Sequence, residues 1–159
     1  MIMSDASTET ALTESMQMYL KAIHQVQSRK GAARVTDIAA IAAVNKASVS
    51  AALKVLAAKN LVNYAPYDLV TLTDDGLRIA EELDRRFRTL THFMTEVLGL
   101  PADQAEENAC SLEHDVSASL SSRLSRFIEY YEACAKPKFR WAAEAGDFCI
   151  DPDDETPSD

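Results

Sequence analysis

Two short helical patterns lie back to back in residues 34–59, with no glycine or proline between them. Thr36 is a suitable N-cap for the first helix, and Asn45 is a suitable N-cap for the second, which we expect over residues 46–59. Only residues 43–44 separate them, which is a turn of the length that holds two helices crosswise. The pattern therefore predicts a helix-turn-helix, whose second helix enters the major groove of DNA.

The second helix has one apolar face and one face of small or basic side chains. Small side chains allow the floor of a groove to approach closely, while hydroxyl and ammonium groups can bond to phosphates or base edges. We expect the following residues to contact DNA: Arg34, Thr36, Lys46, Ala47, Ser48, Ser50 and Lys54. The alternative is a plain alanine-rich helical hairpin in an all-α core.

The net charge of −9 is opposite to what DNA binding requires, but it is unevenly distributed. Residues 144–159 hold seven acids and no Lys or Arg, whereas residues 28–59 hold six bases and a single acid, Asp37. Phosphate binding needs a local positive patch rather than a basic chain. The acidic end, residues 151–159, is expected to be disordered.

Helical and turn patterns predict a mainly α fold with two domains. After a flexible segment, residues 1–12, a winged helix-turn-helix is expected over residues 13–72. It begins with a helix that Thr13 caps and that runs to about Gln27. Two short strands, residues 60–64 and 69–72, follow the recognition helix as a wing, or as a hairpin that only closes the domain.

An all-helical dimerisation domain is expected over residues 73–136. Thr73 caps a long helix to about Leu98, a second helix covers residues 101–115, and Ser117 caps a third. The third helix should bury one face, formed by Leu120, Leu124, Phe127, Ile128 and Tyr131, and end at Pro137. Residues 137–159 form a C-terminal segment with aromatic side chains and the acidic tail.

Several classes of protein are excluded by what the sequence lacks. No apolar run approaches the ~20 residues of a membrane helix, and no secretory signal is recognisable at the N-terminus. The cysteines Cys110, Cys134 and Cys149 are widely spaced and odd in number, which favours a reducing, cytoplasmic location. We interpret the last two as structural. No nucleophile–base pair stands out, so an enzyme is not expected.

Cys110, Glu113 and His114 stand at positions i, i+3 and i+4 of the predicted 101–115 helix. Three such side chains lie on one helical face, within reach of a single ion. Thiolate, carboxylate and imidazole are suitable ligands for a divalent transition metal. The spacing alone also fits a helix whose cysteine only packs in the core.

Five segments occur in the order and spacing of one known family. They are residues 16–20, 34–39, 49–50, 72–76 and 109–114. On these motifs the chain resembles the diphtheria-toxin-repressor family of metal-dependent transcriptional regulators, which includes iron-dependent repressors and manganese-transport regulators. The resemblance covers residues 13–132. It implies a winged helix followed by a metal-binding dimerisation domain, without the third domain that some members add.

The resemblance also implies a ligand set. In the iron-responsive branch a methionine of the first helix joins the Cys, Glu and His of the dimerisation domain, and these correspond to Met18, Cys110, Glu113 and His114. The manganese branch has acids on the first helix and a glutamate in place of the cysteine. Sulfur ligands are softer, so Fe(II) is the expected ion, with Mn(II), Co(II), Ni(II) and Zn(II) as further candidates.

A second metal site of the family uses a His, a Glu and another His. This chain has Phe87, Thr91 and Glu106 at those positions. Phenylalanine cannot bind a metal, so the second site is expected to be lost or rebuilt. His92 and Glu96, one helical turn apart, are either solvated polar residues, which is the favoured interpretation, or candidates for part of a rebuilt site.

We therefore expect a homodimeric, metal-activated repressor that binds a pseudo-palindromic operator in double-stranded DNA. One alternative is a winged-helix regulator that has lost metal control and responds to another ligand or a protein partner. A second is an interaction protein that keeps the dimer and has abandoned DNA.

Overall fold

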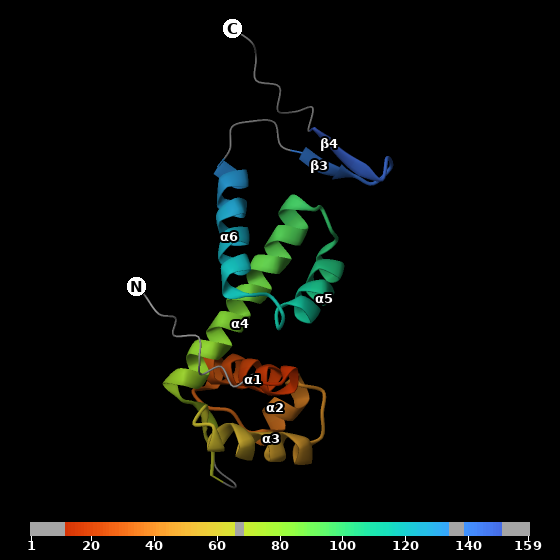
Figure 1. The fold of residues 1–159 in the computed structure, drawn as a ribbon. Helices are drawn as coiled ribbons and strands as arrows, with labels where there is room; N and C mark the ends of the chain where they lie inside the picture. The colour runs from red at the N-terminus through yellow and green to blue at the C-terminus, as the bar shows by residue number, and fades with distance from the viewer. Residues whose placement is uncertain (1–11, 66–68, 134–138, 151–159) are drawn as a thin grey trace, which may run out of the picture. The chain divides into compact units, whose positions relative to one another are not determined.

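A computed structural model describes residues 12–65, 69–133 and 139–150 of the protein. The chain separates into two compact units, residues 1–84 and 85–159, and each is described by itself. The described elements are mainly helical, which confirms the predicted fold class (Figure 1). Their bounds are α1 (Glu14–Lys30), α2 (Val35–Ile41), α3 (Lys46–Ala58), β1 (Val62–Asn63), β2 (Thr71–Leu72), α4 (Asp74–His92), η1 (Phe93–Val97), α5 (Ala102–Leu112), α6 (Ala118–Ala133), β3 (Phe139–Ala142) and β4 (Asp147–Ile150).

Helix α1 begins and ends with the caps that the sequence offers. The Thr13 side chain accepts a hydrogen bond from the Met16 N–H at 3.4 Å. At the other end Gly31 adopts a left-handed conformation (φ 81°), and its N–H donates to the Gln27 carbonyl at 2.8 Å. Glycine is favoured there because a Cβ opposes positive φ. The helix therefore continues to Lys30, three residues beyond the predicted end.

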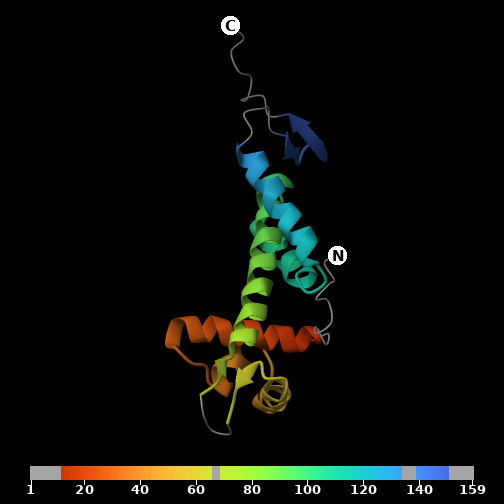
Figure 2. The same ribbon diagram turned by 60° about the vertical axis from the view of Figure 1, so that its left-hand side comes forward.

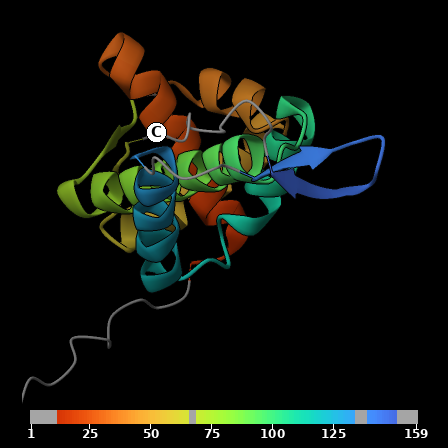
Figure 3. The same cartoon turned by 90° about the horizontal axis from the view of Figure 1, so that it is seen from above.

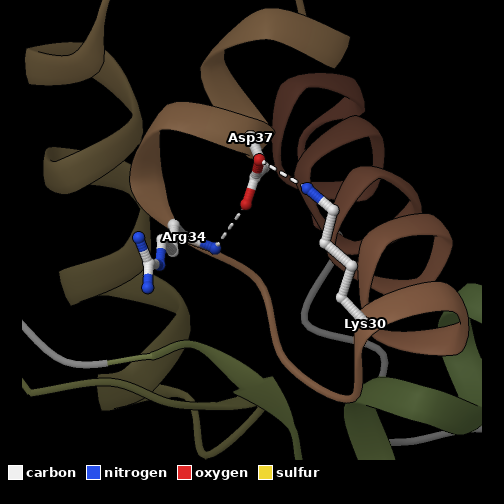
Figure 4. A network of polar contacts seen from close by, with 3 residues as sticks. All are labelled: Lys30, Arg34 and Asp37. Carbon is white, nitrogen blue, oxygen red and sulfur yellow. Dashed lines mark hydrogen bonds and ion pairs between the residues drawn. The ribbon is translucent and has the colours of Figure 1, made fainter.

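Helix α2 begins at Val35, one residue before the predicted N-cap. The predicted N-cap, Thr36, is already helical, and Arg34 is the N-cap residue. Asp37 supplies the capping group instead, because its carboxylate accepts a hydrogen bond from the Arg34 N–H at 3.3 Å (Figure 4). A carboxylate in the first turn also interacts favourably with the positive end of the helix.

Helix α3 has the predicted cap, since Asn45 Oδ1 accepts from the Ser48 N–H at 2.8 Å. Between the two helices Ala43 adopts positive φ (53°), and α2 and α3 cross at 108°. The predicted crosswise arrangement is therefore present. No single helix in the described part of the chain is long and apolar enough to cross a membrane; α2 and α3 meet that test only as a pair, across their bend.

The strands β1 and β2 form an antiparallel hairpin after α3, with Val62 opposite Leu72 (Figure 2). They are shorter than predicted, and part of the turn between them, residues 66–68, lies outside the described residues. Two contacts fix the hairpin to the helices. Ala33 and Val70 exchange backbone hydrogen bonds at 2.8 and 2.7 Å, and Gln27 Oε1 accepts from the Leu72 N–H at 2.8 Å.

The core of the first unit is formed by the inner faces of α1, α2 and α3 together with the hairpin. Its most enclosed side chains, all 0% exposed, include Leu20, Ile23, Ile38, Leu53 and Leu56. Ala80 of α4 belongs to the same cluster. The first unit therefore extends into α4 as far as residue 84.

The second unit packs η1, α5 and α6 with the remainder of α4. Its buried apolar cluster comprises Leu90, Met94, Ala105, Ala109 and Val116. The long predicted helix continues to Val97, but its last part is a π-helix rather than an α-helix. Helix α5 ends at Leu112, three residues before the predicted end.

Helix α6 has the predicted cap, because Ser117 Oγ accepts from the Leu120 N–H at 3.2 Å. Its predicted apolar face is only partly buried. Ile128 is 5% exposed, whereas Leu120 and Phe127 are 48% and 42% exposed. The predicted end at Pro137 lies outside the described residues.

A second hairpin, β3–β4, was not predicted (Figure 3). Phe139 lies opposite Ile150 and Trp141 opposite Phe148, and Gly146 in the connecting turn has φ 64°. The signal was an alternation of apolar and other side chains in both segments, with the period of two that a strand requires.

Candidate metal centre and DNA-binding surface

Helix α3 presents the predicted recognition residues on the face opposite its core contacts. Val49, Leu53 and Leu56 are buried. The side chains on the other face are exposed, namely Lys46, Ala47, Ser48, Ala51 and Lys54. Arg34 and Thr36 are also exposed, while Ser50 is half-buried. The helix therefore offers a surface of small and basic groups that a groove can approach.

The one acid of residues 28–59 is paired within the protein. Lys30 Nζ donates to Asp37 Oδ1 at 3.0 Å, between the end of α1 and the start of α2 (Figure 4). This hydrogen bond, with the Arg34 N–H, holds the pKa of the Asp37 carboxyl below its ordinary value of 3.8. Asp37 thus offsets the charge of Lys30 alone, and the surrounding patch remains positive.

Glu113 and His114 are brought together at the end of α5. Glu113 is the C-cap residue, and its N–H still bonds to the Ala109 carbonyl at 2.9 Å. Its carboxylate is 1% exposed, and His114 Nε2 lies 3.5 Å from its Oε1. Burying a carboxylate is costly unless it is paired or binds a metal, so an enclosed carboxylate beside an imidazole fits the donor set of a metal site.

Cys110 is in a different environment. It lies one turn earlier on α5 and is exposed, with a free thiol. Met18 of α1 is half-buried against the core of the first unit. In the described residues no three His, Cys, Asp or Glu side chains converge closely enough to hold an ion. The structure therefore pairs Glu113 with His114 and leaves Cys110 at the surface.

The residues that replace the family's second metal site offer little to an ion. Phe87 is half-buried and packs against the second core. The Thr91 hydroxyl is buried and has no hydrogen-bond partner in the described part of the chain. Glu106 is exposed. Whether a second site is lost or rebuilt from other groups stays a prediction.

His92 is paired with a residue that sequence spacing did not suggest. Its Nε2 lies 2.7 Å from Glu132 Oε1 on α6, and both side chains are about half exposed. The pair lines an open groove of about 610 Å³ between α4 and α6. Glu132 is forty positions from His92 in the sequence, so only the packing of the two helices reveals the pair.

Family comparisons match both predicted domains in order. Residues 11–70 match the family described as the N-terminal DNA binding domain of iron dependent repressors. Residues 73–140 match its metal binding and dimerisation domain. The two matches together cover most of the chain.

Individual relatives agree with the family matches. An uncharacterised HTH-type transcriptional regulator of Methanocaldococcus jannaschii is 30% identical over 122 residues, which are 76% of this chain and 98% of the relative. The HTH-type transcriptional regulator MntR of Bacillus subtilis is 29% identical over 120 residues, which are 76% of this chain and 84% of MntR.

Solved structures share the fold. The IdeR protein of T. acidophilum has a TM-score of 0.61 and 27% identity, and the match covers 70% of this chain. The manganese regulator SloR has a TM-score of 0.65 and 31% identity, with 78% of this chain covered. The chain spans 53% and 58% of those two solved chains. With both domains, their order and the fold in agreement, this chain belongs to the iron-dependent repressor family of metal-dependent, DNA-binding transcriptional regulators, which is not a family of enzymes.

Proposed function

We propose that this protein is a metal-activated transcriptional repressor that binds a pseudo-palindromic operator as a homodimer, in the cytoplasm. Its two α3 helices would occupy half-sites about one turn of DNA apart, ~34 Å. This role is supported by three exposed basic residues, Arg34, Lys46 and Lys54. They supply positive charge for phosphate binding beside the face of α3 whose small side chains allow a DNA groove to approach.

The observation that carries the metal dependence is the buried carboxylate of Glu113 with the His114 imidazole 3.5 Å away. We propose that Met18, Cys110, Glu113 and His114 hold the ion. A bound ion would compensate the charge of an enclosed carboxylate and favour the thiolate form of Cys110. Two sulfur donors among four ligands favour Fe(II) over Mn(II).

Metal and operator binding should be reciprocally coupled, because the proposed ligands belong to both matched domains. Coupling free energies usually lie at ~1–3 kcal/mol, which alters operator affinity about 5–150-fold. Thiol and imidazole must lose protons to bind an ion, so activation should weaken at acid pH.

The test is an anaerobic fluorescence-anisotropy titration. A duplex is first enriched from a random library in the presence of Fe(II), and is then titrated with protein in Fe(II), Co(II), Mn(II) or chelator. Glu113→Gln and Cys110→Ser should reduce the metal-dependent gain in affinity to below about threefold, which is less than the lower end of the coupling range given above. The matched controls are Glu106→Gln, exposed on the same helix, and Cys149→Ser, outside the proposed ligand set.

Operator binding that is equally tight with metal and with chelator would refute metal activation and support the regulator that has lost metal control. Metal-dependent binding that survives Cys110→Ser would refute the ligand set alone. These two results are distinct, because the first concerns the wild-type protein and the second only the variant.

A further inference from the structure

The hairpin β3–β4 has one apolar face. Residues directly opposite in an antiparallel pair lie on the same side of the strands, so Phe139, Ile150, Trp141 and Phe148 share one face. Arg140, Cys149, Ala142 and Asp147 occupy the other face. An isolated two-stranded hairpin is at best marginally stable in water, so such a face requires a surface to pack against.

Within its own unit the hairpin contacts α6 and Gly99. The Tyr131 hydroxyl of α6 donates to the Phe139 carbonyl at 2.5 Å, and the two rings are 5.2 Å apart. Trp141 lies over Gly99, where an added Cβ would come within 3.0 Å of the Trp141 Cβ. These contacts fix the position of the hairpin and leave part of its apolar face uncovered.

Much of the face remains exposed. Phe139, Trp141, Phe148 and Ile150 are 37%, 40%, 42% and 69% exposed. Aromatic rings in contact continue the face onto α6, since Tyr131 stacks with Phe127 at 6.3 Å, and Phe127 is itself 42% exposed. The result is a continuous apolar surface that runs from α6 across the hairpin.

A second copy of the chain is the occupant that fits this surface. The segment that matches the dimerisation domain ends at residue 140, so it contains all of α6 and the first apolar residue of the hairpin face, Phe139. An isologous dimer uses the same patch on both copies, and an aromatic patch can pack against itself in this way. The apolar surface thus begins within the segment responsible for dimerisation and continues beyond it.

We propose that the apolar face of β3–β4, together with Phe127 of α6, packs against the second copy and extends the dimer interface beyond the region shared with the family. This inference rests on the dimer of the proposed function. It adds a surface, residues 139–150, that lies almost entirely outside the family match.

The test compares the dimer dissociation constant of the full-length wild type with that of Ile150→Thr, by sedimentation equilibrium over a concentration series. Threonine keeps the β-branched shape and strand propensity but removes apolar surface. If Ile150 is buried in the dimer, the dissociation constant should rise by about tenfold or more, because each interface loses two isoleucine side chains. Cys149→Ser, the neighbouring residue on the opposite face, should leave the constant unchanged.

Fluorescence of the single tryptophan, Trp141, is a second readout that needs no substitution. Its emission should shift to the blue, and quenching by acrylamide should weaken, as the wild type passes from monomer to dimer. An Ile150→Thr protein that dimerises like the wild type, with Trp141 equally accessible in monomer and dimer, would overturn the inference and leave the proposed repressor intact. A wild type that stays monomeric with metal and operator would instead refute the dimer of the proposed function.

Discussion

Gly76 lies in the first turn of α4 and packs against the backbone of Leu61, the residue before β1. Its replacement by alanine should therefore destabilise the first unit. A Cβ at this position would come within 1.9 Å of the Leu61 carbonyl oxygen and 2.9 Å of its carbon. Real Cβ atoms essentially never approach another heavy atom closer than 3.0 Å. The obstacle is backbone, so rotation of a side chain cannot relieve it.

Opposing effects set the magnitude. Alanine in a helix interior normally stabilises by ~1 kcal/mol relative to glycine. Displacing Leu61 disturbs the hydrogen bond that its carbonyl accepts from the Thr73 N–H at 3.1 Å, at ~1 kcal/mol, and overpacking costs ~1–3 kcal/mol more. The net expectation is a loss of ~1–3 kcal/mol, which for a chain of this length lowers the Tm by roughly 2–4 °C per kcal/mol.

Differential scanning calorimetry of Gly76→Ala measures this loss, with Gly31→Ala as the matched control. Gly31 also has a special role, with φ 81°, but nothing lies within 4 Å of its added Cβ. The control should therefore show only the cost of a left-handed alanine, ~1 kcal/mol. A Gly76→Ala protein that melts at or above the wild-type temperature would refute the close approach of Leu61 to α4.

Three further predictions concern the DNA-binding unit. Asn45→Ala should lower the free energy of unfolding by ~1 kcal/mol in urea, because it leaves the Ser48 N–H without its cap. Lys46→Gln should reduce the slope of log K against log[salt] by ~1.8 in anisotropy titrations, since a dimer would lose two phosphate contacts; an unchanged slope would place Lys46 away from DNA. Because the pKa of Asp37 is lowered in the folded protein, its stabilising effect is complete above its ordinary value of 3.8 and is lost as the pH falls through the folded pKa. Asp37→Asn should thus lower the Tm at neutral pH, and that difference should vanish well below pH 3.8, whereas a difference independent of pH would exclude the ion pair with Lys30 as its cause.

The proposed metal centre shows how far residue spacing carries a prediction. Cys110, Glu113 and His114 were expected on one face because α5 was expected to continue to Asp115, but the helix ends at Leu112. The burial of Glu113 beside His114 depends on how α5 packs in the second unit, which no local pattern records. The proposed convergence of Cys110 with this pair remains a prediction.

The sequence by itself determined the helix-turn-helix and the mainly helical body. Caps such as Thr13, Asn45 and Ser117 act on backbone groups within three residues, and apolar periodicity decides which face of a helix is buried. These are local interactions, so they can be read from neighbouring residues.

Only the tertiary structure decided the pairing of His92 with Glu132, the contact of Gly76 with Leu61 and the exposed apolar face of β3–β4. Each joins residues that the chain separates by many positions, or depends on which surfaces remain uncovered once the cores have formed. Packing geometry brings such groups together, and a one-dimensional pattern of residue types does not contain it.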